Sequence, residues 1–257
     1  MIHYYVLSSG SCGNCYAFTD GKTTILIDMG FTFTALSKRC ELYNIPLETI
    51  KACFVTHLHP DHSKGLGVLA RKLNCPIFIS QMGVSAETKV MLKLAIPQED
   101  LCPFEFGTSL KVGEFILKPF RTKHDSIGSC GYEILHPEKK FFLLTDCGAT
   151  NDEMVTKMRG KDVFFIESNY SEKLLMEGDY PLPLKNRIRG EYGHMSNDDA
   201  INLIKKAGIE DKIVYFIHLS DSNNEVELVE RNAKTQLGEE FHFQVCERGK
   251  SYEGGVF

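Results

Sequence analysis

The stretch from Phe54 to His62 constrains this chain more than any other, because it places four potential metal ligands at the end of an apolar run. These ligands are His57, His59, Asp61 and His62. Side chains two apart on an extended segment point the same way, so we expect His57 and His59 on one face. Pro60 lacks an N–H and biases His59 away from helical geometry, so a helix is expected to begin only after it.

Four such groups, together with ligands from elsewhere in the chain, exceed one tetrahedral shell and favour two adjacent divalent cations. The alternative is a polar loop that happens to hold three of the nine histidines. Clustered His and Asp at a strand end favour the metal site. The run THLHPDHSKG at residues 56–65 resembles the signature of the metallo-β-lactamase fold. That resemblance implies an α+β protein built as a four-layer αββα sandwich, and a binuclear metallohydrolase.

Composition is that of an ordinary globular protein, and we expect residues 1–257 to form a single domain. The net charge of −5 offers no global basic field for nucleic acid. Nine cysteines without framework spacing indicate a reducing compartment. The first residues do not read as a secretory signal, and no apolar run reaches membrane-spanning length. We therefore expect a cytoplasmic protein with no membrane association.

Hydrophobic periodicity predicts alternating strands and helices along the chain. Strands are predicted at residues 2–7, 16–18, 23–27, 52–55, 76–80, 109–112, 114–120, 131–135, 141–144, 163–166, 213–217 and 241–245. Helices are predicted at residues 34–42, 63–73, 86–94, 154–158, 174–175, 196–207 and 225–237. Ser196 is a plausible N-cap, and Gly208 lies just past the end of that helix. Strands at the centre with helices outside suit the four-layer sandwich.

Three further residues are candidate metal ligands. His124 follows a predicted strand, where a lone histidine is more often a surface residue; it stands where the family supplies its third histidine. Asp146 ends a strand, and its two carboxylate oxygens can bridge two cations, which an imidazole cannot. The neighbouring Cys147 should point the opposite way, into the core. His218 follows an apolar strand and matches the family's last histidine motif.

The resemblance implies a complete set of seven ligands around two metals. One metal takes His57, His59 and His124, the other takes Asp61, His62 and His218, and Asp146 bridges them. Oxygen and nitrogen donors suit Zn²⁺ or Mn²⁺. Two cations lower the pKa of a bridging water, so a hydroxide nucleophile becomes available. Asp28 reads by itself as a turn residue; the family places a supporting carboxylate there, which would orient a metal-bound histidine.

Glu167 and His194 are the candidates for proton transfer, and with Asp61 they are the expected catalytic residues. Glu167 ends a buried strand, and His194 opens a predicted helix. This arrangement resembles the phosphodiesterase branch that includes ribonuclease Z, which implies that His194 protonates the leaving oxygen while Glu167 holds it. A histidine beside a carboxylate suits acid work near neutral pH. The alternative is that His194 is a solvent-facing residue at a helix start.

Motifs over nearly the whole chain resemble the bacterial group called YycJ, WalJ or VicX. They include Ser-x-Gly-Asn-Cys at residues 11–15, Glu-Ser-Asn at 167–169, Gly-His-Met-Ser-Asn at 193–197 and His-Leu-Ser at 218–220. The group implies a cytoplasmic 5′-to-3′ exonuclease acting on DNA. This chain departs from it at Tyr170, where the group tends to carry His, and at Cys12, where it has Ser. Neither departure touches the seven ligands.

A small basic cluster between Glu167 and His194 is a candidate grip for the phosphates of DNA. It consists of Lys185, Arg187 and Arg189, although such a run is usually a solvated face. The leading hypothesis is a metal-dependent phosphodiesterase, most simply a DNA exonuclease. Two alternatives stay open: a small-molecule phosphodiesterase acting on cyclic phosphates, and a regulatory metal-binding protein without significant turnover.

Overall fold

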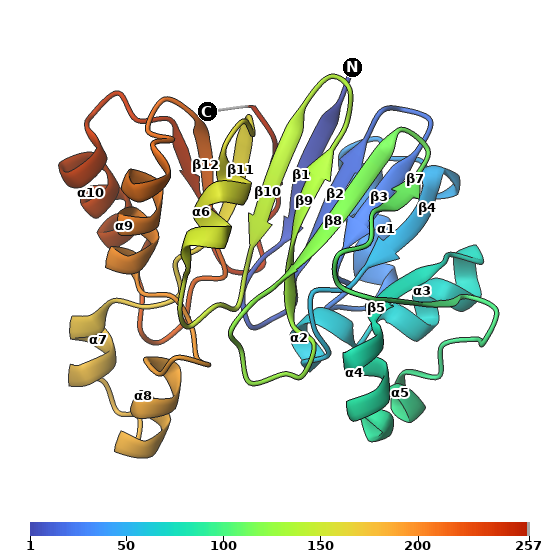
Figure 1. Cartoon of the computed structure of the whole chain (residues 1–257), viewed down its shortest axis with the longest axis horizontal. Coiled ribbons are helices and arrows are strands. Elements are labelled where there is room, and N and C mark those ends of the chain that lie inside the picture. The colour runs from blue at the N-terminus through green and yellow to red at the C-terminus, as the bar shows by residue number, and fades with distance from the viewer. Residues whose placement is uncertain (256–257) are drawn as a thin grey trace.

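The apolar runs pair into two mixed β-sheets of seven strands each within residues 1–255, which a computed structural model describes (Figure 1). The first sheet has the order β14 (Tyr252–Glu253), β1 (His3–Ser8), β2 (Cys15–Thr19), β3 (Thr24–Ile27), β4 (Ile50–Phe54), β5 (Ile77–Ser80), β6 (Leu101–Phe104). The second has the order β13 (Phe243–Val245), β12 (Ile213–Ile217), β11 (Val163–Glu167), β10 (Lys140–Leu144), β9 (Cys130–Leu135), β8 (Phe115–Arg121), β7 (Leu110–Val112). Each sheet has one antiparallel half and one parallel half.

The parallel half of each sheet positions the candidate site residues. Strands β3 to β6 are parallel in the first sheet, and strands β10 to β13 are parallel in the second. Parallel neighbours end at the same edge of a sheet, so the segments that leave them are brought together. The residues that follow β3, β4, β10 and β12 therefore meet at one edge of the sandwich.

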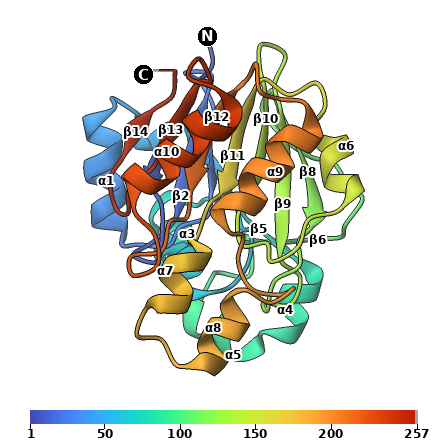
Figure 2. The same cartoon turned by 90° about the vertical axis from the view of Figure 1, so that its left-hand side faces the viewer.

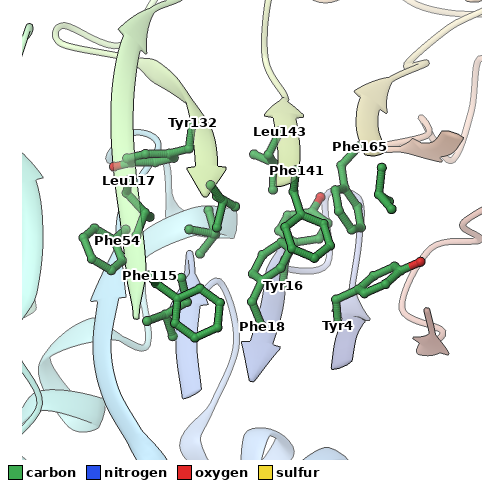
Figure 3. Packing of buried hydrophobic residues seen from close by; sticks show 14 of the residues in the cluster. Tyr4, Tyr16, Phe18, Phe54, Phe115, Leu117, Tyr132, Phe141, Leu143 and Phe165 are labelled. Atoms are coloured by element: carbon green, nitrogen blue, oxygen red, sulfur yellow. The ribbon is translucent and has the colours of Figure 1, made fainter. Parts of the chain in front are cut away.

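Aromatic side chains fill the space between the two sheets (Figure 3). Phe18 and Phe141 meet edge to face with ring centroids 4.9 Å apart, and Phe165 stacks on Tyr215 at 5.1 Å. Each such side chain contributes about 1.5–3 kcal/mol by leaving water. The strands read as unbroken apolar runs because both of their faces are covered. On β10, for instance, Phe141 faces the central core and Phe142 faces the outer helices.

Helices cover the outer face of each sheet (Figures 1 and 2). Helices α1 (Phe33–Leu42) and α3 (Leu66–Leu73) pack on the first sheet. Helices α6 (Asp152–Met158), α9 (Asn197–Ala207) and α10 (Val226–Leu237) pack on the second, and Figure 2 shows α9 and α10 in front of it. The predicted α+β, four-layer αββα sandwich is confirmed.

Shorter helices gather around the edge where the parallel strands end. They are α2 (Pro60–Ser63), α4 (Gln81–Ala86), α5 (Thr88–Leu94), α7 (Glu172–Glu177) and α8 (Leu182–Ile188), and a 3-10 turn at Leu47–Thr49 precedes β4. Figure 1 places α7 and α8 at the lower left, and α4 and α5 at the lower right, with α2 between them. These two groups of helices flank the strand ends.

Several elements differ from their predictions. The predicted helix 63–73 is divided, since α2 ends at Ser63 and α3 begins at Leu66. At Gly65, between them, the chain passes so close to Phe31 that a Cβ would lie 2.2 Å from the Phe31 carbonyl oxygen. Pro60 is the first residue of α2 rather than its predecessor, a position where its missing N–H costs nothing. Strands β6 and β14 and helices α4 and α8 were not predicted, because they are short and bury few apolar side chains.

Among the helices within residues 1–255, none combines the length and the apolar character that crossing a membrane requires.

Candidate active site

The candidate ligands lie where the parallel strands end. Asp28 follows β3, His57 follows β4, Asp146 follows β10 and His218 follows β12, while Glu167 is the last residue of β11. They form a cluster that draws on both sheets. The sequence predicted this convergence only through the family resemblance, since no local pattern states which strands are neighbours.

Three of these residues adopt a left-handed backbone conformation. The φ angles are 63° at Asp28, 51° at Asp146 and 58° at His218. Such angles cost a non-glycine residue roughly 1–2 kcal/mol. The surroundings hold them in place: Asp28 accepts hydrogen bonds from the Thr56 amide and hydroxyl at 2.7 Å, and the His218 amide donates to Ser9 Oγ at 2.7 Å. Strain that is held in this way is typical of functional sites.

One group of three histidines comprises His57, His59 and His124, whose ring nitrogens come within 4.8 Å of one another. The Nδ1 of His124 lies 2.9 Å from the Gly193 carbonyl oxygen, to which it donates, so its Nε2 faces the group. That Nε2 lies 3.2 Å from Nδ1 of His59. The Nε2 of His57 is buried and has no hydrogen-bond partner among residues 1–255. A buried nitrogen without a partner is costly unless a cation takes its lone pair.

A second group comprises Asp61, His62 and His218. The Nδ1 of His62 donates to Asp28 at 2.7 Å, which directs Nε2 into the site. The two Nε2 atoms of His62 and His218 lie 3.3 Å apart, and the Asp61 carboxylate is 3.4 Å from His218. Two imidazole nitrogens that face each other at this distance are suited to a shared cation.

Asp146 lies between the two groups. Its Oδ1 is 3.5 Å from Nε2 of His124, and its Oδ2 is 3.2 Å from Nε2 of His62. Each carboxylate oxygen therefore faces a different group, as a bridging ligand requires. The neighbouring Cys147 is fully buried among apolar side chains of the second sheet and its helices, as predicted.

The charges of this cluster are strongly coupled. Burial opposes ionisation of Asp146, but His218, His62 and His57 hold its pKa well below its usual value. The pKa of Asp61 is lowered by His218 and His62 in the same way. Burial lowers the pKa of His57, which favours the neutral form that ligates metals. Burial also disfavours charged His218, yet Asp146 and Asp61 raise its pKa to about 10. The site therefore keeps the buried carboxylate of Asp146 and the half-buried carboxylate of Asp61 ionised.

These observations fit a metal centre. The metal cluster is the set of seven candidate ligands, His57, His59, Asp61, His62, His124, Asp146 and His218. The donors are oxygen and nitrogen atoms, the carboxylates are anionic, and a buried histidine nitrogen points into the cluster without a partner among the described residues. The arrangement suits hard or borderline divalent cations rather than a thiolate-selected ion.

Glu167 and His194 form a closely bonded pair beside this cluster. The Nδ1 of His194 donates to Glu167 Oε1 at 2.7 Å, and the other oxygen accepts hydrogen bonds from the amides of Cys147 at 2.8 Å and Met195 at 3.2 Å. Burial opposes the charge of His194, but Glu167 and Asp146 raise its pKa. The pair therefore favours a protonated ring at the edge of the metal cluster.

The three predicted phosphate contacts are not alike. Lys185 is buried, and its ammonium donates to the carbonyl oxygens of Met176 and Gly178 at 2.7 Å, so it ties α7 to α8 and is not an exposed phosphate contact. This corrects the prediction. Arg189 pairs with Glu172 at 2.7 Å. Arg187 lines the cavity over the metal cluster.

That cavity has a volume of about 230 Å³. Its lining includes candidate ligands and His194, together with Tyr180, Leu184 and Arg187 from α8 and the segment before it. Arg187 pairs with Asp125 at 2.6 Å, which holds the guanidinium near the cluster. The Arg187 guanidinium, the His194 ring and several candidate ligands therefore line one cavity.

Two asparagines belong to the site and were missed as individual residues. The amide nitrogen of Asn14 lies 3.0 Å from Nε2 of His62, and its carbonyl oxygen accepts from the Gly10 amide at 2.8 Å. The amide nitrogen of Asn169 lies 3.1 Å from Nδ1 of His218. Both lie in motifs that carried the family resemblance, and this was the one signal that could have found them.

Tyr170 and Cys12, where the chain departs from the YycJ, WalJ or VicX group, lie outside the cavity lining. Tyr170 is buried and bridges to Ser196 by its backbone, and Cys12 lies in the turn between β1 and β2. Neither supplies a metal-cluster atom.

Comparison with known proteins agrees with this geometry. Residues 23–219 match the family model described as the β-lactamase superfamily domain. The chain is 32% identical to exodeoxyribonuclease WalJ of Streptococcus pneumoniae over 239 residues, which cover 92% of this chain and 88% of that protein. It is 34% identical to exodeoxyribonuclease YycJ of Bacillus anthracis over 248 residues, which cover 96% of this chain and 92% of that protein.

Solved structures show the same fold at lower sequence identity. The metallo-β-lactamase fold protein YhfI of Bacillus subtilis superimposes with a TM-score of 0.72 at 20% identity, covering 98% of this chain and 99% of that one. The short form of human tRNase Z gives a TM-score of 0.66 at 15% identity, with all of both chains covered. The resemblance drawn from the sequence motifs is confirmed, and this chain belongs to the β-lactamase superfamily, in the group that contains WalJ and YycJ.

Proposed function

We propose that this protein is a metal-dependent exodeoxyribonuclease that hydrolyses phosphodiester bonds in the cavity over the metal cluster. The names of its relatives WalJ and YycJ support a nucleic acid substrate, and DNA in particular. The observation that carries the proposal is the Glu167–His194 pair, which lies against the two groups of three candidate ligands and, with Asp146 and His218, is itself close enough to face an ion. A phosphodiester needs both an activated nucleophile and a proton for its leaving oxygen.

The two groups of three candidate ligands support the seven-ligand assignment. His57, His59 and His124 would hold one divalent cation, Asp61, His62 and His218 would hold a second, and Asp146 would serve both; Zn²⁺ and Mn²⁺ suit these donors. When bound, such cations polarise the phosphate and supply a hydroxide nucleophile near neutral pH. Asp28 keeps His62 in the ligating orientation through its Nδ1.

His194 is the proposed general acid. Its Nδ1 is engaged by Glu167, so Nε2 is the nitrogen that can donate a proton to the leaving oxygen. Two backbone amides donate to the Glu167 carboxylate and fix its position. The His194 ring, which donates to this carboxylate, is therefore held in one orientation. Arg187 is placed to bind a non-bridging phosphate oxygen or a neighbouring phosphate. This division of roles matches the needs of phosphodiester cleavage with a poor leaving group.

The experiment is an assay of protein loaded with Mn²⁺ or Zn²⁺ on 5′- and 3′-end-labelled duplex and single-stranded DNA, with bis-p-nitrophenyl phosphate as a small diester. The Asp61→Ala variant is the matched control, because it removes a metal-cluster carboxylate. We expect progressive shortening of DNA from its 5′ end, which the variant loses.

Turnover of the small diester without DNA shortening would instead favour a small-molecule phosphodiesterase. Absence of all turnover in protein that carries its metals would favour a regulatory protein.

A further inference from the structure

A second cavity adjoins the one over the metal cluster. It has a volume of about 320 Å³ and lies between α2, α5 and the loop that carries Ser126. His59 lines both cavities, so the second cavity borders the metal cluster on the His59 side. The proposed chemistry does not use this second cavity, although anything bound at the metals on the His59 side would reach it.

The second cavity combines aliphatic and polar side chains. Leu58 and Pro60 come from the metal loop, which comprises residues 55–63 after β4, and Val90 and Leu94 come from α5. Its charged residues are Lys64 and Lys93, which are exposed, and Glu87; the Lys64 ammonium also donates to the Cys12 carbonyl oxygen at 3.4 Å. Apolar walls with a few polar groups are what ligand cavities use to bind a flat heterocycle. The two ammonium groups outnumber the Glu87 carboxylate, which favours a ligand that carries a phosphate beside that heterocycle.

The position of the cavity indicates which part of the substrate it meets. His124 contacts His59 on one side, with ring centroids 5.0 Å apart, and His194 on the other, at 5.2 Å. His194 protonates the leaving oxygen, so the leaving group lies on the His194 side. The part of the substrate that keeps the phosphate then lies on the His59 side, where the second cavity opens.

We propose that this cavity binds the nucleoside that retains the phosphate after cleavage, with its base between the aliphatic side chains of the metal loop and α5. This inference rests on the proposed phosphodiesterase activity and extends it, because it assigns a nucleoside-binding subsite. It makes the enzyme prefer nucleoside phosphodiesters to simple ones.

The test compares substrates that share a leaving group but differ in the retained part. These are thymidine 5′-(p-nitrophenyl phosphate), its 3′ isomer, and methyl p-nitrophenyl phosphate. Burial of a base should make kcat/KM for one thymidine ester about tenfold or more higher than for the methyl ester. Equal kcat/KM for the methyl ester and both thymidine isomers would overturn the proposal.

Two substitutions test whether the preference for thymidine esters comes from this cavity. Val90→Phe fills the cavity from α5 and should abolish the thymidine preference while kcat/KM for the methyl ester stays the same. Leu92→Phe is the matched control, since Leu92 lies on the same helix but is 81% exposed and outside the cavity. A thymidine preference that survives Val90→Phe, or that falls equally in Leu92→Phe, would place the nucleoside elsewhere.

These outcomes are separable from those of the proposed function. The p-nitrophenyl esters report on the subsite without requiring cleavage of DNA. If DNA is not shortened but the thymidine preference is present and is lost in Val90→Phe, the exodeoxyribonuclease proposal fails and the subsite stands. If DNA is shortened while the thymidine preference is missing, the exodeoxyribonuclease proposal stands and the subsite proposal fails.

Discussion

His194 gives the clearest single-residue prediction, because it is the proposed general acid and lies outside the two groups of three candidate ligands. His194→Ala should lower the rate of DNA cleavage about 10²–10⁴-fold, the usual contribution of a positioned acid. Cleavage of a p-nitrophenyl ester should fall much less, because p-nitrophenolate leaves without a proton. Steady-state kinetics on both substrates and metal analysis of the variant check this.

Loss of bound metal in His194→Ala would contradict the acid assignment and make the residue a ligand. An equal loss of rate on DNA and on the p-nitrophenyl ester would remove the need for a proton donor.

Asp28 gives a second prediction, since it acts on the metal only through His62. Asp28→Asn keeps the size of the side chain but removes the charge that holds Nδ1 of His62 at 2.7 Å. We expect metal affinity to fall about 10–100-fold, as it does when such partners of ligating histidines are changed. Competition with a chromophoric chelator measures this.

The control for this substitution is Asp20→Asn, because Asp20 accepts hydrogen bonds from the Lys22 and Thr23 amides in an exposed turn just before β3. An asparagine can accept the same bonds, so the affinity should not change. Equal affinities in both variants would show that His62 needs no carboxylate partner.

Side chains at strand ends were predictable one at a time, whereas their hydrogen-bond partners were not. Asp146 and His218 could be named because each follows an apolar strand and matches a motif. The burial of Lys185 could not be foreseen, since it depends on how α7 meets α8 and leaves two carbonyl oxygens in its reach. A local pattern does not report such tertiary contacts.

Among helices and strands, the two-residue break between α2 and α3 packs closely against the segment that follows β3. The Gly65 amide donates to the Met29 carbonyl at 2.9 Å, and a Cβ there would lie 2.2 Å from the Phe31 carbonyl oxygen. Gly65→Ala should therefore lower the free energy of unfolding by about 1–3 kcal/mol, as overpacking does. Urea unfolding measures it.

Gly190→Ala is the comparison, because a Cβ at Gly190 has contacts no shorter than 3.0 Å. We expect a smaller loss of stability there. If the two variants unfold at the same urea concentration, close approach at Gly65 does not shape the loop.

The buried strands were predicted well because both faces of each are covered, so their sequences are unbroken apolar runs. Short elements that bury few apolar side chains were not predicted. In β6 only Phe104 is buried, and α8 presents most of its residues to solvent. A short element that takes its stability from a neighbour has little periodicity of its own.

For the molecule as a whole, the metal cluster joins two sheets that otherwise meet through their apolar core. His57 and His59 follow a strand of the first sheet, whereas His124, Asp146 and His218 follow strands of the second. Cations bound by these residues bind the folded chain and not the unfolded one, and this stabilises it by about 2.7 kcal/mol at a hundredfold excess over Kd.

Removal of metal by a chelator should consequently lower Tm by about 5–10 °C, given the usual 2–4 °C per kcal/mol for chains of similar length. Differential scanning calorimetry of apo and Zn²⁺- or Mn²⁺-loaded protein measures the shift. In Asp146→Ala the shift should shrink, because the carboxylate that faces both groups is gone. A shift that is as large in Asp146→Ala as in the unaltered protein would mean that the stabilising cations bind away from this cluster, and the seven-ligand assignment would fall with it.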